Sequence, residues 1–326
     1  MHHDSTNPSS RRTYIIQRHQ GRDIILSDEI HEKYRRAGKI AAEARDYGAS
    51  LIKEGALYID IATAVETYIT KQGAGIAFPV NISNNEIAAH YSPRHDDTLV
   101  FHKGDLIKLD VGSHVDGYIA DTAVTVEVGT HQYDEMIAAS SKALDNAIDH
   151  IKAGVDLSSI GEIIEQTIAT FGYKPIDNLT GHSLQQYDLH SGISVPNIAN
   201  SIHHMKPKVG DVLAIEPFAT NGAGHVKSGQ SSNIYVCHRS LHMKIIRDRR
   251  IKGAFQQLCH SFKTLPFAQR WCRSILQPKQ TDQVLRKLVL YGLIKQYPQL
   301  IDAKQGMVTQ KEHTLMITDE GCEVMT

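Results

Sequence analysis

The sequence has few cysteines, no long apolar run and almost no net charge. Only four cysteines occur in 326 residues, all of them after residue 236, and none forms a Cys-x-x-Cys pair. This pattern excludes a disulfide framework, argues against a structural zinc knuckle and is typical of a reducing cytoplasm. No apolar stretch reaches the roughly 18 residues that a membrane-spanning helix needs, so we expect no transmembrane segment.

Charge and composition limit the class of partner. The chain has 35 Lys and Arg against 36 Asp and Glu, with a net charge of -1 and a pI near 7.0. Nothing global in this balance attracts nucleic acid or an anionic membrane, although a local basic patch is compatible with it. We therefore expect neither a membrane nor a specific nucleic acid as partner. Hydrophobic residues at 41% and charged residues at 22% are typical of a globular protein.

Three regions of different character follow one another. Residues 1–22 are polar, carry no apolar segment of a secretory signal and are expected to form a flexible extension. Residues 23–326 are expected to form the main body, interrupted at about 238–303 by a helical insert rich in Lys and Arg. Helical and β patterns alternate in the main body, and its helices are expected at 27–53, 60–71, 131–152 and 157–171. The fold class is therefore α+β, with antiparallel strands covered by helices on one face.

Asp110 and Asp121 each lie within or at the end of an apolar β run. Strands at 106–111 and 122–126, joined by a turn at 112–117, would bring the two carboxylates together in a hairpin. Like charges in apolar surroundings repel each other, and a divalent cation removes that conflict. Considered alone, one Asp capping a turn and the other half-exposed is an equally good interpretation.

His182, Glu216 and Glu312 extend this set of candidate ligands. His182 follows a glycine, Glu216 ends an apolar strand, and Glu312 precedes the expected last strand at 313–317. Each of them alone is readily explained as a structural residue, but together they favour a metal site. Carboxylates with one imidazole suit a pair of Mn, Fe, Co or Zn ions better than calcium or a thiolate site. Such a pair is common in hydrolases that activate water.

Eight short segments occur in the order and spacing of a known family. They are residues 76–79, 88–91, 108–112, 119–123, 181–183, 189–192, 214–218 and 312–314. On these segments, residues 24–326 resemble the type-2 methionine aminopeptidases, most closely the archaeal form. The resemblance implies the pita-bread (creatinase/aminopeptidase) fold, in which two α+β halves enclose a metal site. It also implies a winged-helix-like insert. The motifs of that insert are resembled by residues 264–267, 270–271 and 297–298.

The resemblance implies roles for the candidate ligands. Two divalent metal ions (Co, Mn, Fe or Zn) would be bound. Asp110 would hold one of them, Asp121 and Glu312 would bridge both, and His182 with Glu216 would complete the other. Glu216 would also be the proton shuttle when water attacks the carbonyl that follows the methionine.

Two histidines and an apolar pocket would bind the substrate in this family. His90 would hydrogen-bond near the scissile nitrogen, and His190 would stabilise the carbonyl oxygen as charge develops on it. The methionine pocket would be lined by Phe78, Leu189, Ile234, Pro266 and Tyr297. Plain core packing is the alternative for Phe78 and Leu189.

The expected activity is removal of the N-terminal methionine from nascent proteins whose second residue is small. A cytoplasmic monomer is the expected form. An Xaa-Pro peptidase of the same fold is one alternative, because it would use similar ligands. A non-catalytic binding homologue is the other, because some relatives keep the fold and lose the ligands. Ligand-type residues at all five positions, together with both histidines, favour the enzyme.

Overall fold

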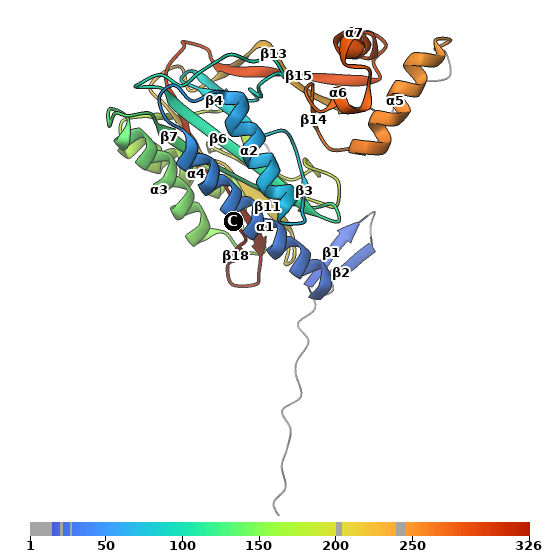
Figure 1. Ribbon diagram of the computed structural model, residues 1–326. Helices are drawn as coiled ribbons and strands as arrows, with labels where there is room; N and C mark the ends of the chain where they lie inside the picture. Colours follow the sequence, from blue (N-terminus) through green and yellow to red (C-terminus); the bar gives the residue numbers. More distant parts are fainter. Residues whose placement is uncertain (1–14, 20–21, 27, 200–203, 239–245) are drawn as a thin grey trace, which may run out of the picture.

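The computed structural model describes residues 15–19, 22–26, 28–199, 204–238 and 246–326, which form two helix-covered halves and an insert (Figure 1). Residues 1–14 of the predicted extension lie outside the described residues. Strands β1 (Ile15–His19) and β2 (Arg22–Leu26) pair as an antiparallel hairpin, so regular structure begins within the predicted extension. In the part of the chain that is described, no helix is both long and apolar enough to cross a bilayer.

The first half packs two helices on an antiparallel sheet. Its elements are α1 (Asp28–Leu51), α2 (Tyr58–Lys71), β3 (Gly75–Ile76), β4 (Asn81–Asn84), β6 (Leu106–Val115) and β7 (Tyr118–Glu127). Ile61, Val65 and Ile69 follow one another at the spacing of a helix turn, so α2 presents one apolar face. That face packs with Ile107 and Leu109 of β6 in a common core. Both predicted helices are confirmed within a few residues.

The hairpin that carries the two aspartates has a tighter turn than predicted. Strands β6 and β7 pair without interruption from Leu106 opposite Glu127 to Val115 opposite Tyr118. The turn is therefore Asp116-Gly117, and both residues have left-handed backbone angles, with φ of 52° and 89°. Asp-Gly favours this two-residue turn because its twist matches that of the strands. The predicted turn at 112–117 is wrong.

The second half repeats the arrangement of two helices on a sheet. Its elements are α3 (Asp134–His150), α4 (Leu157–Thr170), β8 (Lys174–Pro175), β9 (Thr180–Ser183), β10 (Ser194–Pro196), β11 (Val212–Ile215), β12 (Phe218–Thr220), β16 (Val308–Gln310), β17 (His313–Ile317) and β18 (Cys322–Val324). Leu213 and Leu315, on neighbouring strands, pack against α3 and α4. A β-bridge between Ala123 and Glu312 joins the halves. The last strand is β18 and not 313–317 as expected.

The insert is carried by a long antiparallel ribbon. Strands β13 (Val226–Cys237) and β15 (Ile294–Asp302) pair with each other, and β15 also pairs with β5 (Ile87–Ala89) of the main body. The ribbon leads to α5 (Arg249–Phe262), β14 (Phe267–Ala268), α6 (Cys272–Ile275), the 3-10 helix η2 (Pro278–Gln280) and α7 (Thr281–Leu290). These helices stand apart from α1–α4 and have an apolar core of their own (Figure 1). Helices α5 and α7 agree with the helical character predicted for about 238–303, but that region ends in strand β15.

Candidate metal centre

Asp110 and Asp121 are diagonal neighbours on one face of the β6–β7 ladder. Asp110 lies opposite Ala123, and Gly112 lies opposite Asp121. Residues two apart on a strand point to the same face, so the two carboxylates converge across the pair. The carboxyl groups contact each other, and Asp121 is only 4% exposed. The structure therefore brings together the two acids that the hairpin was predicted to join.

The second half contributes His182, Glu216 and Glu312. His182 lies on β9, Glu216 directly follows β11, and Glu312 directly precedes β17. The Nε2 atom of His182 is 3.6 Å from Oδ2 of Asp121 and 3.8 Å from Oε1 of Glu216. Ligand atoms of Asp121, His182 and Glu312 all lie within 4.8 Å of one another, and the three side chains are buried. Five residues, three on strands and two directly beside strand ends, thus line one small space.

The electrostatics of this space are unfavourable without a cation. Burial raises the pKa of Asp110 to about 7. Burial, followed by the charges of Glu312 and Asp110, raises the pKa of Asp121 well above its usual range. Burial and neighbouring carboxylates do the same for Glu216 and Glu312. The Oδ1 atoms of Asp110 and Asp121 are buried without a hydrogen-bond partner. These are the properties of a site shaped for positive charge.

Two side-chain amides that were not predicted from the sequence support the carboxylates. Gln310 donates from Nε2 to Oε2 of Glu312 at 3.1 Å and to Oε2 of Glu216 at 3.4 Å. Asn81 donates from Nδ2 to Oδ2 of Asp110 at 3.3 Å. Hydrogen bonds of this kind orient ligands around a metal. The sequence offered one weak signal for Gln310, which is its position two residues before the candidate ligand Glu312.

One pocket contains every residue predicted for the site. It brings together the five candidate ligands, both candidate histidines and the five residues predicted for the methionine pocket, and Asn81 and Ala89 complete its lining. Phe78 comes from the first half, Leu189 from the second, and Ile234 and Tyr297 from the ribbon of the insert. The pocket therefore combines the polar candidate residues with apolar walls supplied by all three parts of the chain.

His90 and His190 lie beside the ligand set. His90 has a left-handed backbone, with φ of 69°, which is uncommon for a residue other than glycine and often occurs at functional sites. Its ring meets the Tyr297 ring edge-on at a centroid distance of 5.3 Å. Burial lowers the pKa of His90 to about 4, so its imidazole is neutral at pH 7. The ring of His190 is 4.4 Å from the ring of His182.

Comparison with known proteins identifies the family. The profile of metallopeptidase family M24 matches residues 32–244. The methionine aminopeptidase of Methanothermobacter thermautotrophicus is 42% identical over 297 residues, which are 90% of this chain and 98% of that protein. The chain belongs to the methionine aminopeptidases of family M24. Another member, from Thermococcus kodakarensis, is 43% identical and covers 89% of this chain and 97% of its own.

Solved structures of lower identity agree on the fold. The methionine aminopeptidase of Thermotoga maritima has a TM-score of 0.67 at 22% identity, covering 92% of this chain and 98% of its own. A thermophilic Arx1 has a TM-score of 0.80 at 17% identity, covering 92% and 91%. The prolidase of Pyrococcus furiosus has a TM-score of 0.59 at 18% identity, covering 93% of this chain and 65% of its own. The pita-bread fold is therefore confirmed.

Proposed function

We propose that this member of the family removes the N-terminal methionine from nascent polypeptides whose second residue is small. The observation that carries the proposal is the one pocket in which five candidate metal ligands, two histidines and an apolar wall converge. Full-length similarity to methionine aminopeptidases at 42% identity supports the same conclusion. A cytoplasmic monomer stays the expected form.

Asp110, Asp121, His182, Glu216 and Glu312 would hold two divalent metal ions. The orphaned Oδ1 atoms of both aspartates and the carboxylate-rich donor set fit such ions. Burial lowers the pKa of His182 to about 3, which keeps its imidazole in the neutral form that binds metals. When bound, the ions would lower the pKa of the attacking water and polarise the scissile carbonyl.

The remaining steps use side chains of the chain itself. Glu216 takes the proton of the attacking water on a carboxylate oxygen and passes it to the leaving amine. Its side chain is 15% exposed, so it faces the pocket as well as the ligand cluster. His90, neutral at pH 7, hydrogen-bonds near the scissile nitrogen. His190 donates to the carbonyl oxygen as negative charge develops there.

The apolar wall selects methionine by shape. Phe78 and Ile234 are 5% and 4% exposed, and Pro266 is also buried, so the wall is firmly packed. A hydrophobic pocket discriminates by about 1–3 kcal/mol per misfit methylene, which corresponds to roughly 10–200-fold in kcat/KM. An unbranched thioether should therefore be preferred over a β-branched side chain.

Peptide cleavage tests this proposal directly. The metal-loaded protein should cleave Met-Ala-Ser faster than Val-Ala-Ser, and Met-Ala-Ser faster than a peptide with a large second residue. Preference for an Xaa-Pro peptide would instead show that the activity is that of the prolidases, which share the fold. Absence of any turnover with each metal added separately would favour a binding homologue.

A further inference from the structure

Arg270 and Trp271 belong to a motif of the insert, yet neither lines the pocket. Their side chains turn towards the main body and meet Glu66 of helix α2. Arg270 forms an ion pair with Glu66, and Nε1 of Trp271 donates to Oε2 of Glu66 at 2.9 Å. The side chains of Arg270 and Glu66 are only 8% and 9% exposed. A charged pair this deeply buried is costly, so its position in the fold calls for an explanation.

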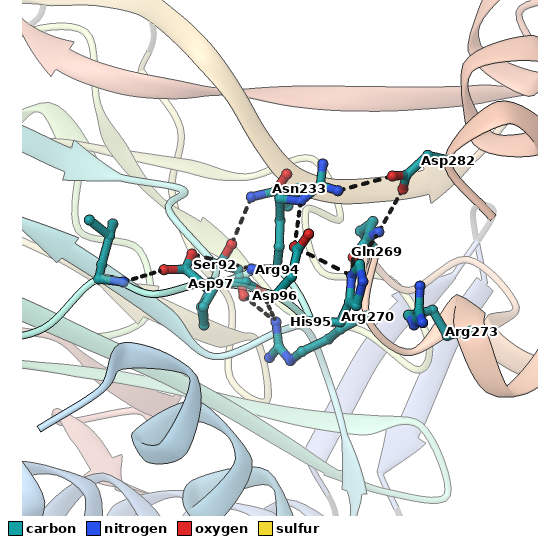
Figure 2. A network of polar contacts seen from close by, with 12 residues as sticks. Ser92, Arg94, His95, Asp96, Asp97, Asn233, Gln269, Arg270, Arg273 and Asp282 are labelled. Atoms are coloured by element: carbon teal, nitrogen blue, oxygen red, sulfur yellow. Dashed lines mark hydrogen bonds and ion pairs between the residues drawn. The ribbon is translucent and has the colours of Figure 1, made fainter. Parts of the chain in front are cut away.

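The ion pair is part of a closed ring of hydrogen bonds. Oε1 of Glu66 accepts from the backbone N–H of Val80 at 3.3 Å. The hydroxyl of Ser92 donates to the carbonyl oxygen of Val80 at 2.8 Å. Arg270 closes the ring, because its Nη1 donates to Oγ of Ser92 at 2.9 Å while its Nη2 contacts Glu66. Figure 2 shows the contact of Arg270 with the Ser92 segment.

On the main-body side, the ring fixes two segments, and each of them contains a residue of the pocket. Val80 is two residues after Phe78, the first-half wall of the pocket. Ser92 is two residues after His90, whose left-handed backbone requires a firmly held neighbourhood. Ser92 itself is fully buried. The ring therefore sets the distance between the segments that present Phe78 and His90.

On the insert side, the ring fixes two further walls. Arg270 is four residues after Pro266, and the strand between them pairs with β13 at Ile234. The Nδ2 atom of Asn233, the residue before Ile234, donates to the carbonyl oxygen of Ser92 at 3.1 Å (Figure 2). Pro266 and Ile234 are thus tied to the same serine that holds the His90 segment.

We propose that Glu66, Arg270 and Ser92 are positioning residues that set the width of the methionine pocket. Apolar residues at this contact would join the insert to the main body at no loss of stability, but they would not fix one position of the insert relative to the main body. The planar fork of arginine fixes direction as well as distance, which a point charge does not. This inference rests on the proposed methionine specificity.

A second contact between the same two parts provides a matched control. Arg94 pairs with Asp282 of α7 at 2.9 Å, and Gln269 donates to Asp282 at 2.6 Å (Figure 2). The side chains of Arg94 and Asp282 are 39% and 36% exposed, so solvent reaches this ion pair, although Gln269 itself is buried. Partly exposed ion pairs of this kind contribute little to stability. The Arg94–Asp282 pair also lies outside the ring of hydrogen bonds.

The test compares Arg270→Lys, Glu66→Gln and Ser92→Ala with Asp282→Asn. For each protein, kcat and KM are measured on Met-Ala-Ser and Val-Ala-Ser, together with bound metal and the melting temperature. We expect the three ring variants to keep their metal and lose at least about tenfold in the Met-to-Val ratio of kcat/KM, mainly through KM for Met-Ala-Ser. Asp282→Asn should retain the wild-type ratio within about twofold.

Arg270→Lys separates positioning from simple charge balance. Lysine keeps the charge beside Glu66 but lacks the fork that also reaches Ser92. A wild-type Met-to-Val ratio in folded Arg270→Lys and Ser92→Ala would overturn the inference. Ser92→Ala leaves the ion pair in place, so it reports on the ring even if a change to the pair prevents folding. Failure of the proposed function is distinct, because the wild-type protein itself would then not cleave Met-Ala-Ser.

Discussion

Four carboxylates share one buried space at the centre of this protein, and each raises the free-energy cost of the others. Burial and neighbouring charges raise the pKa of Asp121, Glu216 and Glu312 well above the ordinary range. Such a cluster stabilises a bound cation at the expense of the metal-free fold. Function and stability therefore pull in opposite directions at these residues.

Glu312→Gln should reveal this conflict. Turnover of Met-Ala-Ser should fall by at least about a thousandfold, because the substitution removes a predicted bridging ligand. The chelator-treated variant should nevertheless be more stable to urea than chelator-treated wild type, by about 1–3 kcal/mol, because one buried charge is gone. Glu320→Gln, at an exposed position, is the control and should change neither quantity. If metal-free Glu312→Gln were less stable than metal-free wild type, the proposed opposition between function and stability would be wrong.

Asp302 should stabilise the end of the insert ribbon. Burial alone would raise its pKa, but backbone N–H groups that include those of Ala223, Gly306 and Lys304 outweigh burial and lower it. Asp302→Asn should therefore lower the free energy of unfolding by about 2 kcal/mol at pH 7. A depressed folded pKa contributes its full stability above the unfolded pKa of about 3.9, and this contribution is lost as pH falls from there through the folded pKa. The difference should shrink as pH falls below that value in urea titrations, and a constant difference would exclude this origin.

At the scale of elements, strand β6 supports the pocket as well as the ligands. A Cβ atom on Gly112 would collide with the ring of Phe78. Gly112→Ala should push Phe78 into the pocket and raise KM for Met-Ala-Ser by about tenfold, with metal content unchanged. Gly253→Ala is the control, because nothing lies within 4 Å of a Cβ there and α5 should gain about 0.5–1 kcal/mol. An unchanged KM in Gly112→Ala would mean that the ring moves aside freely.

Helices were easier to predict from the sequence than the turn that was expected to contain Gly112. Helices α1 to α4 were predictable because each has an apolar face at helical spacing, as Ile61, Val65 and Ile69 show. Gly112 was interpreted as part of a turn, but it lies within strand β6, at a position where a side chain would collide with the Phe78 ring. Local sequence cannot distinguish a glycine required by a turn from one required by packing.

The ligand set was predictable to the extent that each ligand has a local signal. Asp110, Asp121 and Glu216 are carboxylates at apolar strands, which is unusual wherever it occurs. The resemblance to a family was still needed to assign their roles. Gln310 carries no comparable signal. Neither does the pairing of Glu66 with Arg270, which joins residues 204 positions apart.

At the scale of the whole molecule, the metal centre connects the two halves. Asp110 and Asp121 come from the first half, whereas His182, Glu216 and Glu312 come from the second. The backbone bridge between Ala123 and Glu312 crosses the same boundary. Bound metal would therefore link the halves and offset the repulsion between their carboxylates.

Metal removal should consequently loosen the molecule as well as inactivate it. A ligand at about 100 times its Kd adds about 2.7 kcal/mol to the folded state, so chelation should lower the melting temperature by several degrees. Re-addition of Mn, Fe, Co and Zn one at a time should restore activity and melting temperature in the same order. Chelation should lower the melting temperature of Glu312→Gln by less than that of wild type. That variant binds metal less tightly, and its remaining carboxylates repel one another less when the metal is absent. If chelation abolished activity and left the melting temperature unchanged, the metal would serve the reaction without joining the halves.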